Sequence, residues 1–194
     1  MERIKVGEVE IAFTSEGIRG RKVRKTYFFP YRRYAEVPFF TLLVLAGREK
    51  EESALMGIVE KYTLPVIREI IAVVGKEIDW RKFQKWSHLK VVYSAKPEDV
   101  ILTSLKDGLR VLSPRSQAVI LCLANRPILE SDKLEKLIKA SLKEERDIVV
   151  PLIGGEPSHP IIIPRRTALK MLKTRKEMGI PYFGKRWRKE VPCD

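Results

Sequence analysis

Residues 118–138, AVILCLANRPILESDKLEKLI, contain the clearest strand and helix signals of the chain. This stretch opens with a continuous apolar run, 118–124, which is typical of a strand buried on both faces of a parallel sheet. A helix is expected from about Ser131, because apolar residues recur there at helical spacing and Lys and Glu fill the other side. Those apolar residues are Leu134, Leu137, Ile138 and Leu142. Asn125, the only asparagine in the chain, stands where the strand ends.

The same alternation of strand and helix extends in both directions. Strands are expected at 70–75, 89–93, 147–153 and 161–163, and helices at 79–86, 97–112 and 166–177. Residues 154–160, which hold two glycines and two prolines, predict a turn. This pattern predicts an α/β fold, a three-layer sandwich with a mainly parallel central sheet. Ligands of such sheets bind at the carboxyl ends of the strands, where Asn125 is expected to lie.

The first 69 residues are less regular. Residues 3–13 alternate like an early strand, and the basic, glycine-containing residues 14–26 predict a loop. The apolar region 37–67, interrupted by the charged cluster 48–52, predicts two helices. With no repeat or linker in view, residues 1–194 are expected to form a single domain with a basic C-terminal tail from about residue 173.

Positive charge is concentrated in two segments. Residues 19–33 and 165–189 together carry a net charge of +16, against +13 for the whole chain. Such clusters favour a polyanionic partner: a nucleoside triphosphate, a phosphorylated ligand or nucleic acid. The common alternative for any one cluster is a solvated charged face.

Other features of the composition limit the function further. The chain contains one Asn and two Gln among many charged residues, a bias typical of thermophilic proteins. Its two cysteines form no metal-binding spacing. The longest apolar run, 37–46, is too short to span a bilayer, so no membrane partner is expected and the cytoplasm is the predicted location.

Three stretches in order resemble one known family: VILTSLKDGL (100–109), 118–138, and DIVVPLIGGEPSHPIIIPR (147–165). The series resembles the molybdenum-cofactor nucleotidyltransferases, or MobA-like NTP transferases, over about residues 70–172. The resemblance implies a Rossmann-like fold of the nucleotide-diphospho-sugar-transferase type. It also implies transfer of a nucleoside monophosphate from GTP or CTP to a phosphorylated molybdopterin-type acceptor, with release of pyrophosphate and with Mg²⁺ as the cofactor.

The resemblance also assigns residues to the site. Asn125 takes the position of the family's metal-binding aspartate, and its neutral amide implies a weakened Mg²⁺ site. Ser104 is implied as a nucleotide-binding residue, and the turn residues Gly154, Gly155 and His159 as substrate-binding ones. For Asn125 the competing interpretation is a turn residue before a helix; for Ser104 and His159 it is local packing.

The family's nucleotide-binding loop has two candidate positions here. One is 45–47, Leu-Ala-Gly, but the acidic residues after it would face a triphosphate. The other is 12–30, which follows the expected first strand and is strongly basic. We favour the second, which assigns Gly17, Gly20, Arg21 and Lys25 to nucleotide binding and Lys25 and Arg19 to catalysis.

The departures from the family pattern leave alternatives for the function. The acidic metal ligand that the family carries near its C-terminus has no clear counterpart except Asp194. A degenerate relative that binds a nucleotide or pterin without transfer is therefore one alternative. The other is a nucleic-acid-binding protein, suggested by aromatic and basic residues interleaved over 182–188. The sequence does not indicate an oligomeric state.

Overall fold

The computed structural model describes residues 2–6, 9–14, 17–22, 38–62, 64–83, 86, 89–94, 101–143, 147–173 and 188–194. Its main feature is an eight-stranded sheet. The strand order is β11 (Arg188–Pro192), β8 (Ile148–Ile153), β10 (Ile161–Pro164), β7 (Ala118–Leu123), β4 (Phe40–Ala46), β5 (Ile67–Val74) and β6 (Leu89–Tyr93), with β9 (Glu156–Pro157) paired to β8. All neighbours on this path are parallel except β10, which runs antiparallel to β7 and β8.

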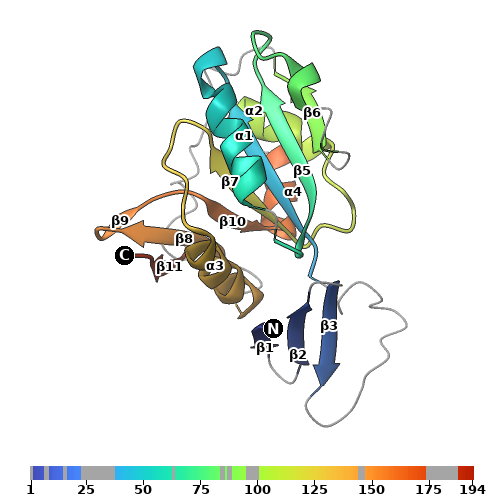
Figure 1. Cartoon of the computed structure of the whole chain (residues 1–194), viewed down its shortest axis with the longest axis vertical. Coiled ribbons are helices and arrows are strands. Elements are labelled where there is room, and N and C mark those ends of the chain that lie inside the picture. The colour runs from blue at the N-terminus through green and yellow to red at the C-terminus, as the bar shows by residue number, and fades with distance from the viewer. Residues whose placement is uncertain are drawn as a thin grey trace.

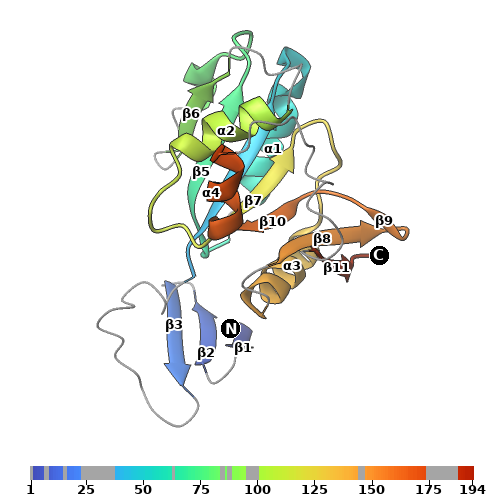
Figure 2. The same cartoon turned by 180° about the vertical axis from the view of Figure 1, so that it is seen from behind.

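Helices cover both faces of the sheet. In Figure 1, α1 (Glu52–Lys61) and α3 (Ser131–Lys143) lie in front of it, and in Figure 2, α2 (Ile101–Arg110) and α4 (Arg165–Lys173) do. Side chains of β4 alternate between the two cores: Leu42 and Val44 pack with α1 and α3, whereas Leu43 and Leu45 pack with α2 and α4. The expected three-layer α/β sandwich with a mainly parallel sheet is confirmed.

The elements expected from residue 70 onward are present where the structure describes them. β5, β6, β7, β8 and β10 lie at the expected strands, and α2, α3 and α4 lie within or close to the expected helices. The short helix expected at 79–86 is a 3-10 turn, η2 (Trp80–Phe83). None of the described helices has the length and apolar character that crossing a bilayer requires.

The expectation of two helices over 37–67 is wrong for its first half. Residues Phe40–Ala46 form β4, the strand between β5 and β7, and the 3-10 turn η1 (Glu49–Glu51) then leads into α1. Every residue of β4 is buried, because helices cover both faces of the sheet at this point. A strand buried on both faces has no alternation of apolar and polar residues to reveal it.

The N-terminal region also differs from the expectation. β1 (Glu2–Val6), β2 (Val9–Thr14) and β3 (Gly17–Lys22) form a separate antiparallel sheet, so the loop expected at 14–26 is wrong for 17–22. In Figure 1 this sheet lies beyond the amino end of β4. The carboxyl end of β4 lies at the other end of the strand. The three-stranded sheet is therefore on the opposite side of the molecule from the carboxyl ends of the parallel strands.

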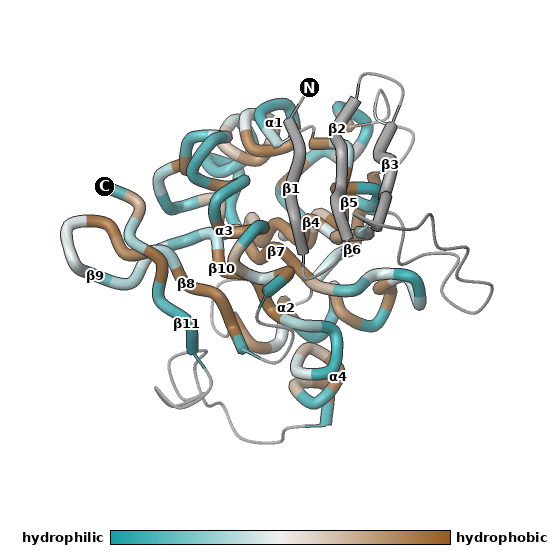
Figure 3. The backbone as a smooth tube through the Cα atoms, turned by 90° about the horizontal axis from the view of Figure 1, so that it is seen from below, coloured by the Kyte–Doolittle hydropathy of each residue, from teal (hydrophilic) through white to brown (hydrophobic). Residues whose placement is uncertain are grey.

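The C-terminal end of the chain is part of the main sheet and is not a tail. β11 pairs in parallel with β8, from Arg188 opposite Ile148 to Pro192 opposite Leu152. In Figure 3 β8 is largely apolar, whereas β11 is mostly hydrophilic, so no apolar run marks β11 as a strand in the sequence. The aromatic and basic residues at 182–187 lie outside the described residues.

Candidate functional site

A pocket of about 230 Å³ opens at the carboxyl ends of the parallel strands, between α2 and the β4–α1 turn. It lies at the edge where ligands of open α/β sheets bind. Its lining comes from β4, β5, β7, α2 and the turns after β4 and β7. The lining residues are Leu45, Ala46, Gly47, Arg48, Lys50, Glu51, Val73, Ile101, Ser104, Leu123 and Asn125.

Backbone hydrogen bonds fix the strand ends around this pocket. The Ala124 N–H donates to the Leu45 carbonyl at 2.9 Å, and the Gly75 N–H donates to the Ala46 carbonyl at 3.1 Å. The turns that follow β5 and β7 are thereby tied to the end of β4. The pocket is built on rigid strand ends, which suits a site that must hold a ligand in one position.

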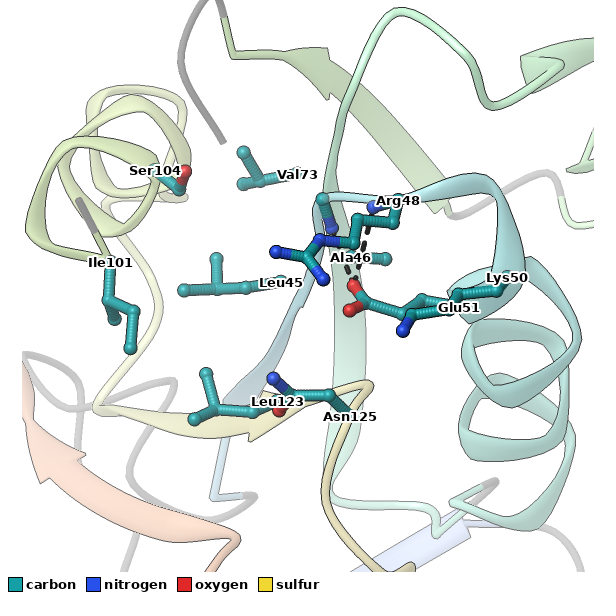
Figure 4. A pocket seen from close by; sticks show the side chains of 11 residues that line it. Leu45, Ala46, Arg48, Lys50, Glu51, Val73, Ile101, Ser104, Leu123 and Asn125 are labelled. Atoms are coloured by element: carbon teal, nitrogen blue, oxygen red, sulfur yellow. Dashed lines mark hydrogen bonds between the residues drawn. The ribbon is translucent and has the colours of Figure 1, made fainter. Parts of the chain in front are cut away.

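The charged side of the pocket is the turn after β4, shown in Figure 4. Arg48 and Lys50 place two cationic side chains there, beside the carboxylate of Glu51. That carboxylate accepts hydrogen bonds from two backbone N–H groups, Gly47 at 2.7 Å and Arg48 at 3.4 Å. Successive N–H groups that point at one anion form the kind of concavity that binds phosphate in many proteins.

The opposite side of the pocket is mostly apolar. Leu45, Val73, Leu123 and Ile101 form this wall, and Ser104 of α2 adds one hydroxyl. Ser104 is buried, and its Oγ lies 3.4 Å from the Oγ of Ser94, which donates to the Asp107 carboxylate at 3.0 Å. Ser104 therefore lies in the wall of the pocket, and its binding to the nucleotide stays a prediction.

Asn125 lies in the turn directly after β7, exposed at the rim of the pocket. Figure 4 shows its amide on the same side of the pocket as the Arg48 and Glu51 side chains. The helix that follows begins only at Ser131, so Asn125 does not cap it. The sequence thus located this residue correctly, at the carboxyl end of a central strand.

The residues of the predicted basic loop lie elsewhere. Gly17, Arg19, Gly20 and Arg21 belong to β3, whose residues pair one by one with β2 from Thr14 to Val9. They therefore lie on a strand of the separate N-terminal sheet and do not line the pocket. Lys25 lies outside the described residues. A phosphate-binding or catalytic role for these five residues stays a prediction.

The predicted substrate-binding turn lies after β8. Gly154 and Gly155 have φ of +58° and +80°, a left-handed conformation that favours glycine, and neither lines the pocket. His159 is half-buried, with Nδ1 3.4 Å from the Leu121 carbonyl oxygen. Burial lowers the pKa of His159; the hydrogen bond to the Leu121 carbonyl opposes this shift, and the nearby positive charge of Arg126 adds to it. The neutral, packed imidazole fits a structural role for His159 in holding this turn against β7.

The side chains that the structure describes form no ready-made cage for a divalent cation. Among them, no group of three or more His, Cys, Asp or Glu is placed to hold a metal ion. Glu51 is the carboxylate of the pocket, and backbone N–H groups already engage it. Asp194, the other candidate ligand, accepts a hydrogen bond from the Gly154 N–H at 2.5 Å and does not line the pocket.

The residues that make the charged side of this site are not among those that the sequence predicts for nucleotide binding. Gly47, Arg48, Lys50 and Glu51 follow the strand β4, which was expected to be a helix. The signal was present, because Leu45-Ala-Gly47 was one of the two candidate positions for the nucleotide loop. It was set aside because of the acidic residues after it, and the structure shows one of them, Glu51, folded back onto the turn.

The chain matches the model of one known protein family. A family model described as a MobA-like NTP transferase domain matches residues 41–191. The match begins in β4 and leaves out β1–β3, so it includes the pocket and excludes the predicted basic loop. Among curated protein sequences, none matches the chain significantly.

Solved structures with the same fold are distant in sequence. Rv0371c from Mycobacterium tuberculosis H37Rv, in complex with manganese, is 17% identical, with a TM-score of 0.60 over 79% of this chain and 88% of that one. Its homologue from Mycobacterium sp. strain JC1 is 15% identical, with a TM-score of 0.61 over 80% and 86%. The 4-diphosphocytidyl-2C-methyl-D-erythritol synthase from Anaerococcus prevotii is 17% identical, with a TM-score of 0.59 over 81% and 88%.

Proposed function

Since the chain belongs to the MobA-like NTP transferase family, we propose that it binds a nucleoside triphosphate in this pocket and transfers the nucleotidyl group to a phosphorylated acceptor. In this reaction an oxygen of the acceptor phosphate attacks the α-phosphorus. The bond from that phosphorus to the oxygen bridging to the β-phosphate breaks, and pyrophosphate leaves. Positioning and neutralisation of charge supply most of the rate enhancement in such transfers.

One observation carries the proposal: a single pocket joins a polar, cationic side to an apolar side. The N–H groups of Gly47 and Arg48 and the side chains of Arg48 and Lys50 suit a triphosphate. The apolar wall with the Ser104 hydroxyl suits a nucleoside. The two sides lie at the carboxyl edge of the sheet, and the family match covers both.

The nucleotide, the acceptor, the cellular location and the cation are further parts of the proposal. We retain GTP or CTP as the nucleotide and a molybdopterin-type phosphate as the acceptor on the sequence resemblance alone, and the cytoplasm as the location on the shortness of the longest apolar run. The neighbours include a protein named as a diphosphocytidyl-methylerythritol synthase, which widens the choice of acceptor. Any Mg²⁺ would be held chiefly by the phosphates of the nucleotide, since the described side chains offer no ready cage.

Isothermal titration calorimetry with each of the four ribonucleoside triphosphates, with Mg²⁺ and with EDTA, tests nucleotide binding. Arg48→Ala should weaken binding about tenfold, since it removes a charge-assisted contact to phosphate. Arg68→Ala, which removes the same charge from an exposed residue near the amino end of β5, is the control. Equal affinities for Arg48→Ala, Arg68→Ala and the unmodified chain would contradict the placement of the triphosphate.

A second candidate function is nucleotide binding without transfer. Asn125 favours it, because a neutral amide stands where the resembled family has a carboxylate. The described pocket also contains no cluster of carboxylates. A pyrophosphate-release assay with every triphosphate and a range of phosphorylated acceptors separates the two functions. Binding without any pyrophosphate release would leave this second function in place of the first.

A further inference from the structure

The Glu51 carboxylate occupies the part of the pocket where phosphate is proposed to bind. Its Oε2 lies 2.7 Å from the Gly47 nitrogen and 3.4 Å from the Arg48 nitrogen, and Figure 4 shows both hydrogen bonds as dashed lines. The first is a short, charge-assisted contact. A backbone hydrogen bond stabilises the turn itself: the Glu51 N–H donates to the Arg48 carbonyl at 2.9 Å.

A carboxylate and a phosphate are the same kind of partner for these N–H groups. Both are anions that present oxygen acceptors, and each backbone N–H has one hydrogen to donate. An anion held at 2.7 Å from the Gly47 nitrogen also repels a second anion approaching the same point. The two therefore cannot occupy the turn together.

From this contact we infer that Glu51 is an internal competitor: its side chain fills the anion site of the β4–α1 turn, and a phosphate ligand binds only by displacing it. The inference rests on the proposed function and adds a regulation of the same site. Displacement requires rotation of one side chain. Glu51 is only half-buried and lies on a 3-10 turn of three residues, so this rotation does not disturb the core.

The test compares Glu51→Gln and Glu51→Ala with the unmodified chain. Glu49→Gln is the matched control, because it removes the same charge from an exposed residue of the same turn that does not line the pocket. Inorganic triphosphate, GTP and CTP are titrated by calorimetry in EDTA and again with Mg²⁺. Thermal unfolding of each variant establishes that it is folded.

Both Glu51 variants should bind inorganic triphosphate about tenfold more tightly than the unmodified chain, since the charged competitor is gone. Glu49→Gln should stay within about twofold, because an exposed charge is screened. Equal affinities in Glu51 variants and control would overturn the inference while leaving the proposed function intact. Weaker binding in the Glu51 variants, in Mg²⁺ only, would also overturn it, by showing that Glu51 holds the cation. If no variant binds any of the ligands, the proposed function fails as well.

Discussion

Asn125 takes the position of the family's metal-binding aspartate in the sequence resemblance, and it lines the pocket in the structure. It lies at the rim of the pocket after β7, on the side of Arg48 and Glu51. Its amide oxygen can coordinate a hard cation, but it brings no negative charge to the site. The cation affinity of the site is therefore expected to depend on this one functional group.

Asn125→Asp tests that dependence. With Mg²⁺ or Mn²⁺ the variant should bind nucleotide more tightly, because a carboxylate attracts the cation that the phosphates share. In EDTA it should bind more weakly, because the new charge repels the phosphates. Gln117→Glu, an equivalent change in the residue before β7 at the opposite end of the strand, should alter neither affinity. If Asn125→Asp changes only the stability of the fold, Asn125 is a turn residue.

His159 gives a dependence of stability on pH. Its pKa in the folded chain is below the usual 6.5, with burial as the main cause, so the unfolded chain binds the proton more readily. The free energy of unfolding should therefore fall as the pH drops below 6.5 and through the lowered pKa. Urea unfolding across this range should show a smaller fall for His159→Gln than for the unmodified chain. Parallel pH profiles for the two proteins would rule out this contribution.

At the scale of elements, periodicity predicted the amphipathic helices well and the buried strands unevenly. The stretch 118–138 was identified correctly because an uninterrupted apolar run precedes a clear helical stripe. The sequence of β4 predicts a helix as readily as a strand, because its leucine-rich, fully apolar pattern is equally compatible with a buried helix. The choice of 12–30 over 45–47 for the nucleotide loop rests on charge instead, because acidic residues follow Gly47.

The charged side of the site could not be derived from residue types alone. The acidic residues after Gly47 seemed to exclude a phosphate, whereas the structure turns Glu51 back onto the backbone. That contact depends on the local 3-10 turn, which the sequence pattern does not reveal. Asn125 and Ser104, by contrast, could be located because they lie on or next to elements with strong apolar patterns.

The packing of α2 on the sheet depends on Gly108. A Cβ there would lie 2.5 Å from Cδ1 of Leu43 and 2.8 Å from Cγ2 of Val73, both in the buried core. Overpacking of a core costs about 1–3 kcal/mol, which outweighs the gain in helix propensity of about 1 kcal/mol. Gly108→Ala should therefore lower the free energy of unfolding, as measured with urea.

Gly57→Ala in α1 is the matched control. Its Cβ would meet only Cδ1 of Ile128, at an ordinary contact distance of 3.4 Å. The same substitution should therefore stabilise the chain by up to about 1 kcal/mol through helix propensity. Gly108→Ala variants as stable as Gly57→Ala variants would show that α2 can move away from the sheet without cost.

In the whole molecule, the carboxyl ends and the amino ends of the parallel strands have different roles. The carboxyl edge holds the pocket, and the amino edge holds a polar cluster around the buried Glu69. Its carboxylate accepts hydrogen bonds from the Thr41 hydroxyl at 2.6 Å, the Lys90 ammonium at 2.6 Å and the Ser113 N–H at 3.1 Å. These partners come from β4, β6 and the loop after α2, so Glu69 ties that edge together.

Glu69→Ala should lower the free energy of unfolding by about 2 kcal/mol, because the Ser113 N–H loses its acceptor and the Thr41 hydroxyl is left with Ser116 Oγ, 2.8 Å away. Lys90 is half-exposed and adds little to this cost. Nucleotide affinity should stay unchanged, since the cluster lies at the opposite edge from the pocket. A variant that is stable but binds nucleotide poorly would refute this separation between the edges.

The proposed triphosphate site is tested most directly by titrating the ¹⁵N-labelled chain with GTP or CTP and Mg²⁺ and following the backbone amide chemical shifts. If the β4–α1 turn holds the triphosphate, the largest shifts should occur at Gly47 and Arg48, with a further shift at Asn125. Shifts confined to β3, around Gly17–Lys22, would place the nucleotide at the basic N-terminal segment instead and contradict the proposed site.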